Sequence, residues 1–138
     1  MSNYKGLVFP LYRDIIERAV EQDKDVFVKF SRRQIDEGEE LYLYESGENG
    51  RRKIVAKATV TNSQHLKPSK VKENYSDRVF QTEEELDEYT RGRGNKEMLV
   101  LELDDLEYLD QPVEAPGNLT VAGLYLNDER YEKLKKAM

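Results

Sequence analysis

The chain has 138 residues, of which 36% are charged and 38% hydrophobic, and its formal net charge is −6 at pH 7. A chain of this length can bury a core without disulfides or metal, so we predict a single domain over residues 1–138. No apolar run approaches the ~20 residues of a membrane span, and the first residues lack the pattern of a secretory signal. We therefore expect a cytoplasmic protein that has no role in a membrane.

Cysteine is absent and His65 is the single histidine of the chain. Without cysteine there is no disulfide, no thiol nucleophile and no thiolate metal site. A zinc site or a serine–histidine triad would have His65 alone to build on. We therefore expect no metal and no cofactor.

Charges are segregated along the chain. Residues 51–72 carry seven bases and no acid, whereas residues 102–114 carry six acids and no base. Such runs are usually solvated surface. A molecule with one basic and one acidic side can nevertheless hold an anion, because the local potential in a cleft matters more than the net charge.

The first predicted elements are a short strand and a helix. Residues 6–9 form an apolar run that is typical of a strand. Pro10 fits the first turn of a helix, where its missing N–H costs nothing. Apolar residues then recur on one face, which predicts a helix over 10–22.

Three runs with strand-like alternation follow. Residues 26–30 predict a strand with large side chains on both faces, and residues 41–46 and 52–61 predict a hairpin around the turn 47–50, which is rich in Gly and Asn. Residues 62–76 show no period, so we predict a long basic loop there.

The C-terminal half predicts two helices and two strands. A capping box that begins at Thr82 predicts a helix over 83–89. The apolar run 98–103 is typical of a strand buried on both faces, and 119–126 predicts a last strand that a glycine interrupts. A helix over 128–137 completes the chain.

These elements predict an α+β, mainly β fold. Five or more mostly antiparallel strands with short peripheral helices can bend into a barrel, which removes the sheet edges that would otherwise invite aggregation.

The order of these elements resembles the ASCH domain of the PUA-like superfamily, in particular a mainly archaeal branch. Lys24 stands at the lysine of the family pattern, Lys29 at its arginine and Gly38 at its glycine, while Tyr44-Glu45-Ser46 matches the end of a strand. The resemblance implies a PUA-like pseudobarrel with a cleft between the first helix and the barrel. Its relatives bind RNA or modified nucleosides, and some hydrolyse acetylated cytidine or cleave RNA.

Two positions depart from this pattern. Gln22 replaces the first glycine, and Phe27 replaces a glutamate or hydroxyl residue. The second departure removes a group that catalysis would need.

The first hypothesis is a module that binds RNA or a modified nucleotide in a basic cleft. Cations that contact phosphates and aromatic rings that stack on bases are the usual means of holding single-stranded RNA. The candidate ligand-binding residues are Tyr12, Lys24, Lys29, Arg32, Tyr44, Ser46, Arg91 and Arg93. Tyr42 and Tyr75 are further candidates for stacking, although tyrosines on barrel faces usually just pack.

The second hypothesis is a hydrolase of modified nucleosides, similar to an acetylcytidine amidohydrolase, or a ribonuclease. Lys24, Glu45 and His65 are the candidate catalytic residues, and Ser46 can complete a site. Because Phe27 leaves this set without its centre, the sequence favours binding over catalysis. A third alternative is a protein-interaction module that uses the acidic segment 102–114, and the oligomeric state stays open.

Overall fold

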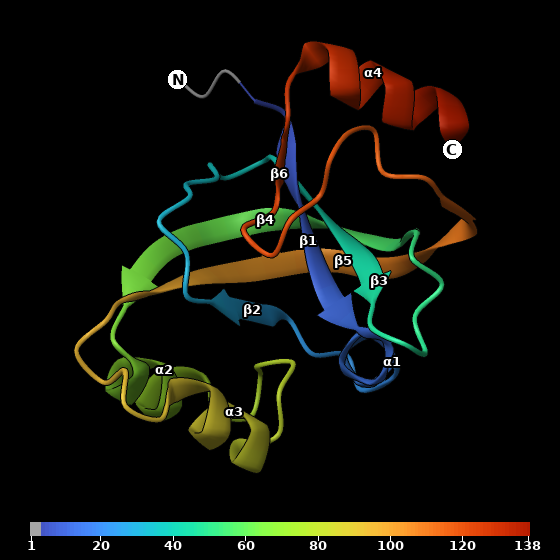
Figure 1. Ribbon diagram of the computed structural model, residues 1–138. Helices are drawn as coiled ribbons and strands as arrows, with labels where there is room; N and C mark the ends of the chain where they lie inside the picture. Colours follow the sequence, from blue (N-terminus) through green and yellow to red (C-terminus); the bar gives the residue numbers. More distant parts are fainter. Residues whose placement is uncertain (1–3) are drawn as a thin grey trace.

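The chain folds into one curled sheet of mostly antiparallel strands. A computed structural model describes residues 4–138, in which six strands pair in the order β2-β5-β4-β3-β1-β6. Four pairs are antiparallel and the pair β1–β3 is parallel. The strands are β1 (Gly6–Tyr12), β2 (Val26–Lys29), β3 (Glu40–Ser46), β4 (Ile54–Leu66), β5 (Met98–Val113) and β6 (Leu124–Leu126). Figure 1 shows this sheet bent into a half-barrel, which confirms the predicted PUA-like pseudobarrel with peripheral helices.

Four helices of the described residues cover the sheet. They are α1 (Arg13–Glu21), α2 (Pro68–Tyr75), α3 (Glu83–Thr90) and α4 (Asp128–Ala137). Figure 1 shows α2 and α3 together beside β2, with α4 at the opposite end next to β6. None of the helices in residues 4–138 is long and apolar enough to cross a membrane.

Strand alternation divides the core into layers. Phe27 of β2 and Leu99 and Leu101 of β5 point into the barrel, where Phe27 stacks on the ring of Phe9 at 5.1 Å between centroids. The alternate residues of the same two strands pack instead beneath α2 and α3. The prediction that residues 98–103 are buried on both faces is therefore confirmed, because helices cover the outer face as well, and β2 has large side chains on both faces as predicted.

The prediction that a helix begins at Pro10 is wrong. Pro10 lies in β1, opposite Tyr44 of β3, and α1 begins at Arg13. Strand β1 pairs with β6 only as far as Val8, so Pro10 has a sheet neighbour on one side only. A residue without an N–H is tolerated at such an open edge.

The predicted basic loop over residues 62–76 is also wrong. Strand β4 continues to Leu66, and Pro68 then begins α2 as the first helical residue. The polar stretch stays extended because it pairs with Met98–Glu102 of β5, whose other edge is paired with β2. Backbone hydrogen bonds between two long strands thus stabilise a strand whose sequence lacks the apolar alternation by which strands are predicted.

The predicted strand 119–126 shrinks to Leu124–Leu126. Gly123 has φ of +87°, which a side-chain-bearing residue rarely adopts, and a Cβ there would lie 2.7 Å from Cε1 of Phe9. The segment before Gly123 is therefore free to turn away from the sheet, where Leu119, Thr120 and Val121 line a cleft.

The two oppositely charged segments of the chain lie side by side. Antiparallel pairing of β4 with β5 places Lys57 opposite Glu107, and Nζ of Lys53 lies 3.8 Å from a carboxylate oxygen of Glu114. Segregation of charge along the chain therefore does not produce one basic and one acidic side.

Candidate functional site

A mostly apolar cleft lies between α1, α3 and the ends of β1, β2 and β3. Its volume is about 540 Å³, and we call it the lysine cleft. Its apolar and aromatic lining comprises Pro10, Leu11, Tyr12, Ile15, Val28, Tyr44, Tyr89, Leu119 and Val121. Its polar lining comprises Lys29, Ser46, Gln81, Glu85 and Thr120. An apolar hollow with a few convergent polar groups is the usual form of a small-ligand site.

Lys29 ends β2 and is the one lysine or arginine that lines this cleft. Its ammonium group lies 5.5 Å from the ring centroid of the buried Phe9. Within residues 4–138 no carboxylate lies within ion-pair distance of this group. Burial lowers the pKa of Lys29 below its usual value, because the charged form loses hydration that no ion pair replaces.

Two tyrosine rings of the cleft contact neighbouring backbone. Tyr12 precedes α1 and is 65% exposed, and its ring packs against Gly47, where a Cβ would come within 2.9 Å of Cδ1. The hydroxyl of Tyr89 on α3 accepts a hydrogen bond of 2.9 Å from the N–H of Phe30. The Tyr89 ring is thus oriented by the backbone, whereas most of the Tyr12 ring is open to solvent.

The start of α3 closes one side of the cleft. The predicted capping box is present, since Thr82 Oγ1 accepts from the N–H of Glu85 and the Glu85 carboxylate accepts from the N–H of Thr82. Arg18 of α1 donates to the same carboxylate at 2.5 Å and to the carbonyl oxygen of Phe80. Burial alone would raise the pKa of Glu85, but the hydrogen bonds from Arg18 and Thr82 outweigh it and lower the pKa.

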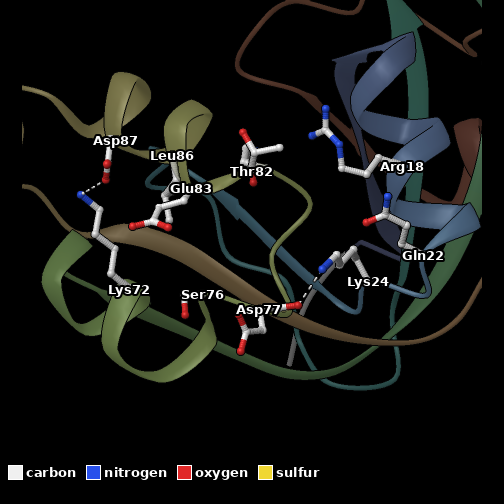
Figure 2. A pocket seen from close by; sticks show the side chains of 11 residues that line it. Arg18, Gln22, Lys24, Lys72, Ser76, Asp77, Thr82, Glu83, Leu86 and Asp87 are labelled. Carbon is white, nitrogen blue, oxygen red and sulfur yellow. Dashed lines mark hydrogen bonds and ion pairs between the residues drawn. The ribbon is translucent and has the colours of Figure 1, made fainter.

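Lys24 lies in a different hollow, on the other side of the Arg18–Glu85 pair. This hollow has a volume of about 370 Å³, and we call it the paired-charge pocket. Lys24 Nζ donates to the carbonyl oxygen of Asp77 at 2.8 Å, and Lys72 pairs with Asp87 at 2.9 Å; both interactions are drawn in Figure 2. The structure therefore does not bring Lys24 and Lys29 together.

A third hollow of about 440 Å³ holds two other predicted residues, Arg32 and His65. Nε2 of His65 is buried and has no hydrogen-bond partner in the described residues. Arg93 lies close to this hollow, with its guanidinium 5.2 Å from the ring centroid of Phe30. Arg91, in the same loop, pairs with Glu88 at 3.1 Å.

Several of the remaining candidates have structural partners. Glu45 is 1% exposed, and its carboxylate accepts a hydrogen bond from the N–H of Arg51, which holds the turn after β3. Tyr42 is fully buried and donates to Glu40, and burial raises its pKa further than this carboxylate does. The Tyr75 hydroxyl accepts from the side-chain amide of Gln64. Tyr42 is thus inaccessible to a base.

The lysine cleft thus unites Tyr12, Lys29, Tyr44 and Ser46 of the predicted set. Tyr89 and Thr120 line the same cleft but were not among the candidates. Tyr89 has the spacing of a helix core position relative to Leu86, and Thr120 belonged to a predicted strand, so neither carried a signal of its own. Phe27 fills the barrel core and leaves no reactive group at its position. No three metal-ligating side chains are grouped within the part of the chain that the structure describes.

Solved structures that share this fold include proteins from two organisms. The ASCH protein from Zymomonas mobilis has 15% sequence identity with a TM-score of 0.80, covering 96% of this chain and 94% of that one. A tyrosine-to-phenylalanine mutant of the same protein has 14% identity with a TM-score of 0.80, covering 96% and 97%. The N-terminal domain of Staphylothermus marinus McrB has 9% identity with a TM-score of 0.58, covering 100% and 96%. At these identities the likeness concerns the fold alone.

A comparison with curated proteins found no match. A family model described as a domain of unknown function, DUF365, matches residues 4–128. This match spans every strand and the three helices α1 to α3. The chain therefore belongs to the DUF365 family and has the fold of an ASCH domain.

Proposed function

We propose that the protein binds a nucleobase of RNA or of a modified nucleotide in the lysine cleft. One observation carries the proposal: a mostly apolar hollow of about 540 Å³ with three tyrosines in its wall contains a partly buried lysine that has no carboxylate partner among the described residues. A base is flat and apolar on its faces but polar at its edge, so stacked rings and one donor suit it.

The chemistry of Lys29 favours a carbonyl or ring nitrogen as its partner. The ammonium group is partly desolvated, so a hydrogen bond to a ligand acceptor replaces hydration that folding has already removed. The hydroxyls of Ser46 and Thr120 line the same cleft and can donate or accept at the base edge. One nucleobase can therefore contact the apolar wall with its faces and these polar groups with its edge.

The test is an NMR titration with cytidine 5′-monophosphate, with N4-acetylcytidine as a modified base. We expect backbone signals of Tyr12, Lys29 and Tyr89 to shift. Thr120→Phe places a bulky ring at the cleft wall and should abolish the shifts. The matched control is Ala122→Phe, since Ala122 is exposed in the same loop and does not line the cleft. Equal binding by the two variants would place the ligand elsewhere and contradict the proposal.

A second candidate is hydrolysis of a modified nucleoside, and the lowered pKa of Lys29 favours it specifically. A lysine whose pKa is lowered has a larger neutral fraction and can accept a proton from water or from a hydroxyl. Ser46 and Thr120 supply hydroxyls in the same cleft. Chromatography of N4-acetylcytidine after incubation tests this candidate, because turnover should occur with the parent chain and be lost in Lys29→Met. Absence of turnover leaves binding as the function.

A further inference from the structure

A group of cations lies beyond the end of β2, next to the lysine cleft. Arg32 and Lys96 line the third hollow, and Arg93 lies beside it in the exposed loop after α3. Within residues 4–138 none of these three side chains lies within ion-pair distance of a carboxylate. We call this surface the arginine face. Its one acidic member is Glu97, which is exposed.

A ridge of two tilted aromatic rings and one guanidinium group joins the arginine face to the lysine cleft. Tyr89 lines the cleft, and its ring lies 5.1 Å from that of Phe30, which lines the third hollow. The Arg93 guanidinium covers both rings, at 5.2 Å from the centroid of Phe30 and 5.7 Å from that of Tyr89. Consecutive residues of the chain, Lys29 and Phe30, thus belong to adjacent sites.

The loop that carries Arg93 is folded rather than extended. The N–H of Arg93 donates to the carbonyl oxygen of Thr90 at 2.9 Å, and the N–H of Lys96 donates to that of Arg93 at 3.0 Å. Gly92 adopts φ of +74°, which permits the tight turn between α3 and Arg93. Arg93 is therefore held on the ridge by backbone turns as well as by the two rings.

A free nucleoside would fill the lysine cleft and leave the arginine face unused. Cations and aromatic rings that alternate along a surface are the usual means of holding a single-stranded backbone. His65 borders the third hollow, and its buried Nε2 lacks a partner in the described residues. Because that nitrogen is enclosed by protein, a ligand in the hollow would contact the cations and Phe30 rather than His65 Nε2.

We infer that the ligand is a single-stranded nucleic acid rather than a free nucleotide, an inference that rests on the function proposed for the lysine cleft. One base enters the cleft, and the adjoining sugar-phosphate crosses the ridge beside Arg93. The next phosphates lie against Arg32 and Lys96. The arginine face thereby favours a single-stranded nucleic acid over a free nucleotide, and the lysine cleft binds one base of that strand.

The experiment compares a labelled single-stranded RNA of about ten nucleotides with cytidine 5′-monophosphate, by fluorescence anisotropy and by competition. We expect the RNA to bind at least ~10-fold more tightly, because its further phosphates reach Arg32 and Lys96, which the single phosphate of the mononucleotide does not. The double variant Arg32→Ala/Arg93→Ala should remove most of this difference. Mononucleotide affinity should fall less than RNA affinity, because its one phosphate reaches Arg93 but not Arg32. Both residues are exposed, so the fold is not at risk.

Arg91→Ala is the matched control. Arg91 lies in the same loop as Arg93 and carries the same charge, but it is already paired with Glu88. We expect Arg91→Ala to change RNA affinity by less than ~2-fold. The double variant should also flatten the dependence of log K on log salt by about 1.4, from about 0.7 for each lost phosphate contact on a single strand.

Three outcomes overturn different claims. If RNA binds no more tightly than the mononucleotide and Thr120→Phe abolishes binding of both, the single-stranded ligand is refuted. The lysine cleft then stays the base site. RNA binding that is lost in the double variant but unchanged in Thr120→Phe would show that no base occupies the lysine cleft. An equal loss in Arg91→Ala and Arg93→Ala would show that only net charge matters and would also refute the ridge contact.

Discussion

The lysine cleft and the paired-charge pocket lie on opposite sides of the Arg18–Glu85 pair. They differ in whether their charged groups already have partners within the protein. In the paired-charge pocket each cation already has an oxygen partner, as Lys24 donates to the Asp77 carbonyl and Lys72 pairs with Asp87. In the lysine cleft Lys29 faces apolar and aromatic side chains. The number of charged groups in a hollow is thus a poor guide to binding. What matters is whether any of them lacks a partner.

This difference predicts unequal effects of the same substitution at the two lysines. Lys29→Met should weaken binding of cytidine 5′-monophosphate by about 10-fold to 100-fold, since a hydrogen bond from a charged donor contributes about 1.5–3 kcal/mol. Lys24→Met should leave affinity unchanged, because Lys24 lines the other pocket. Isothermal calorimetry of the two variants measures both values, and equal losses would remove the distinction between the pockets.

Loss of the cap at the start of α3, the helix that lines the lysine cleft, should lower both stability and base affinity. Thr82→Ala removes the hydroxyl that accepts from the Glu85 N–H, and loss of such a cap costs about 1 kcal/mol of unfolding free energy. Because Glu85 and Tyr89 line the cleft from α3, base affinity should fall as well. Chemical denaturation and titration check the two effects. Thr82→Ser keeps the hydroxyl and should behave like the parent chain.

The pH dependence of stability should distinguish Lys29 from an ordinary surface lysine. Its folded pKa lies below its usual value of 10.5, so the unfolded chain binds more protons between these two values and stability rises with pH through that window. Below the window burial disfavours the charged form, and the partial exposure of the side chain limits this effect. Lys29→Met should therefore be more stable than the parent chain at pH 7, and the gain should vanish above pH ~10.5. Thermal melts at several pH values test this, and a less stable variant at pH 7 would contradict the desolvation of Lys29.

The smallest effect is expected at Lys72 in the paired-charge pocket. Its pair with Asp87 is largely exposed, with side-chain exposures of 40% and 55%. Lys72→Met should change the unfolding free energy by no more than about 0.5 kcal/mol and leave nucleotide affinity unchanged. A measurable loss of affinity would show that the paired-charge pocket takes part in binding.

Much of the fold could be predicted because it depends on local patterns. The alternation of Leu41 and Leu43 with Tyr42 places the leucines in the barrel core and the tyrosine on the opposite face. The capping box at Thr82 and the Asn127 cap are formed by residues three positions apart, so they can be read without knowledge of the rest of the chain.

The extension of β4 to Leu66 could not be predicted in the same way. Its polar residues carry no period, and they are extended because β5 lies beside them. The same pairing brings Lys57 opposite Glu107, which cancels a charge separation that is present only along the chain. Contacts between distant segments override local propensity at both places.

The sequence by itself determined the barrel layers, the helix caps and the presence of Tyr12, Lys29, Tyr44 and Ser46 as residues able to hold a base, because each of these follows from residue type and short-range spacing. Only the tertiary structure decided which of them share a cleft, that Lys24 lies outside it with its donor already used, and that Tyr89 belongs inside it. The physical reason is that a binding site depends on burial and on unpaired hydrogen-bonding groups. Both are properties of how strands and helices pack together, which no single segment of sequence contains.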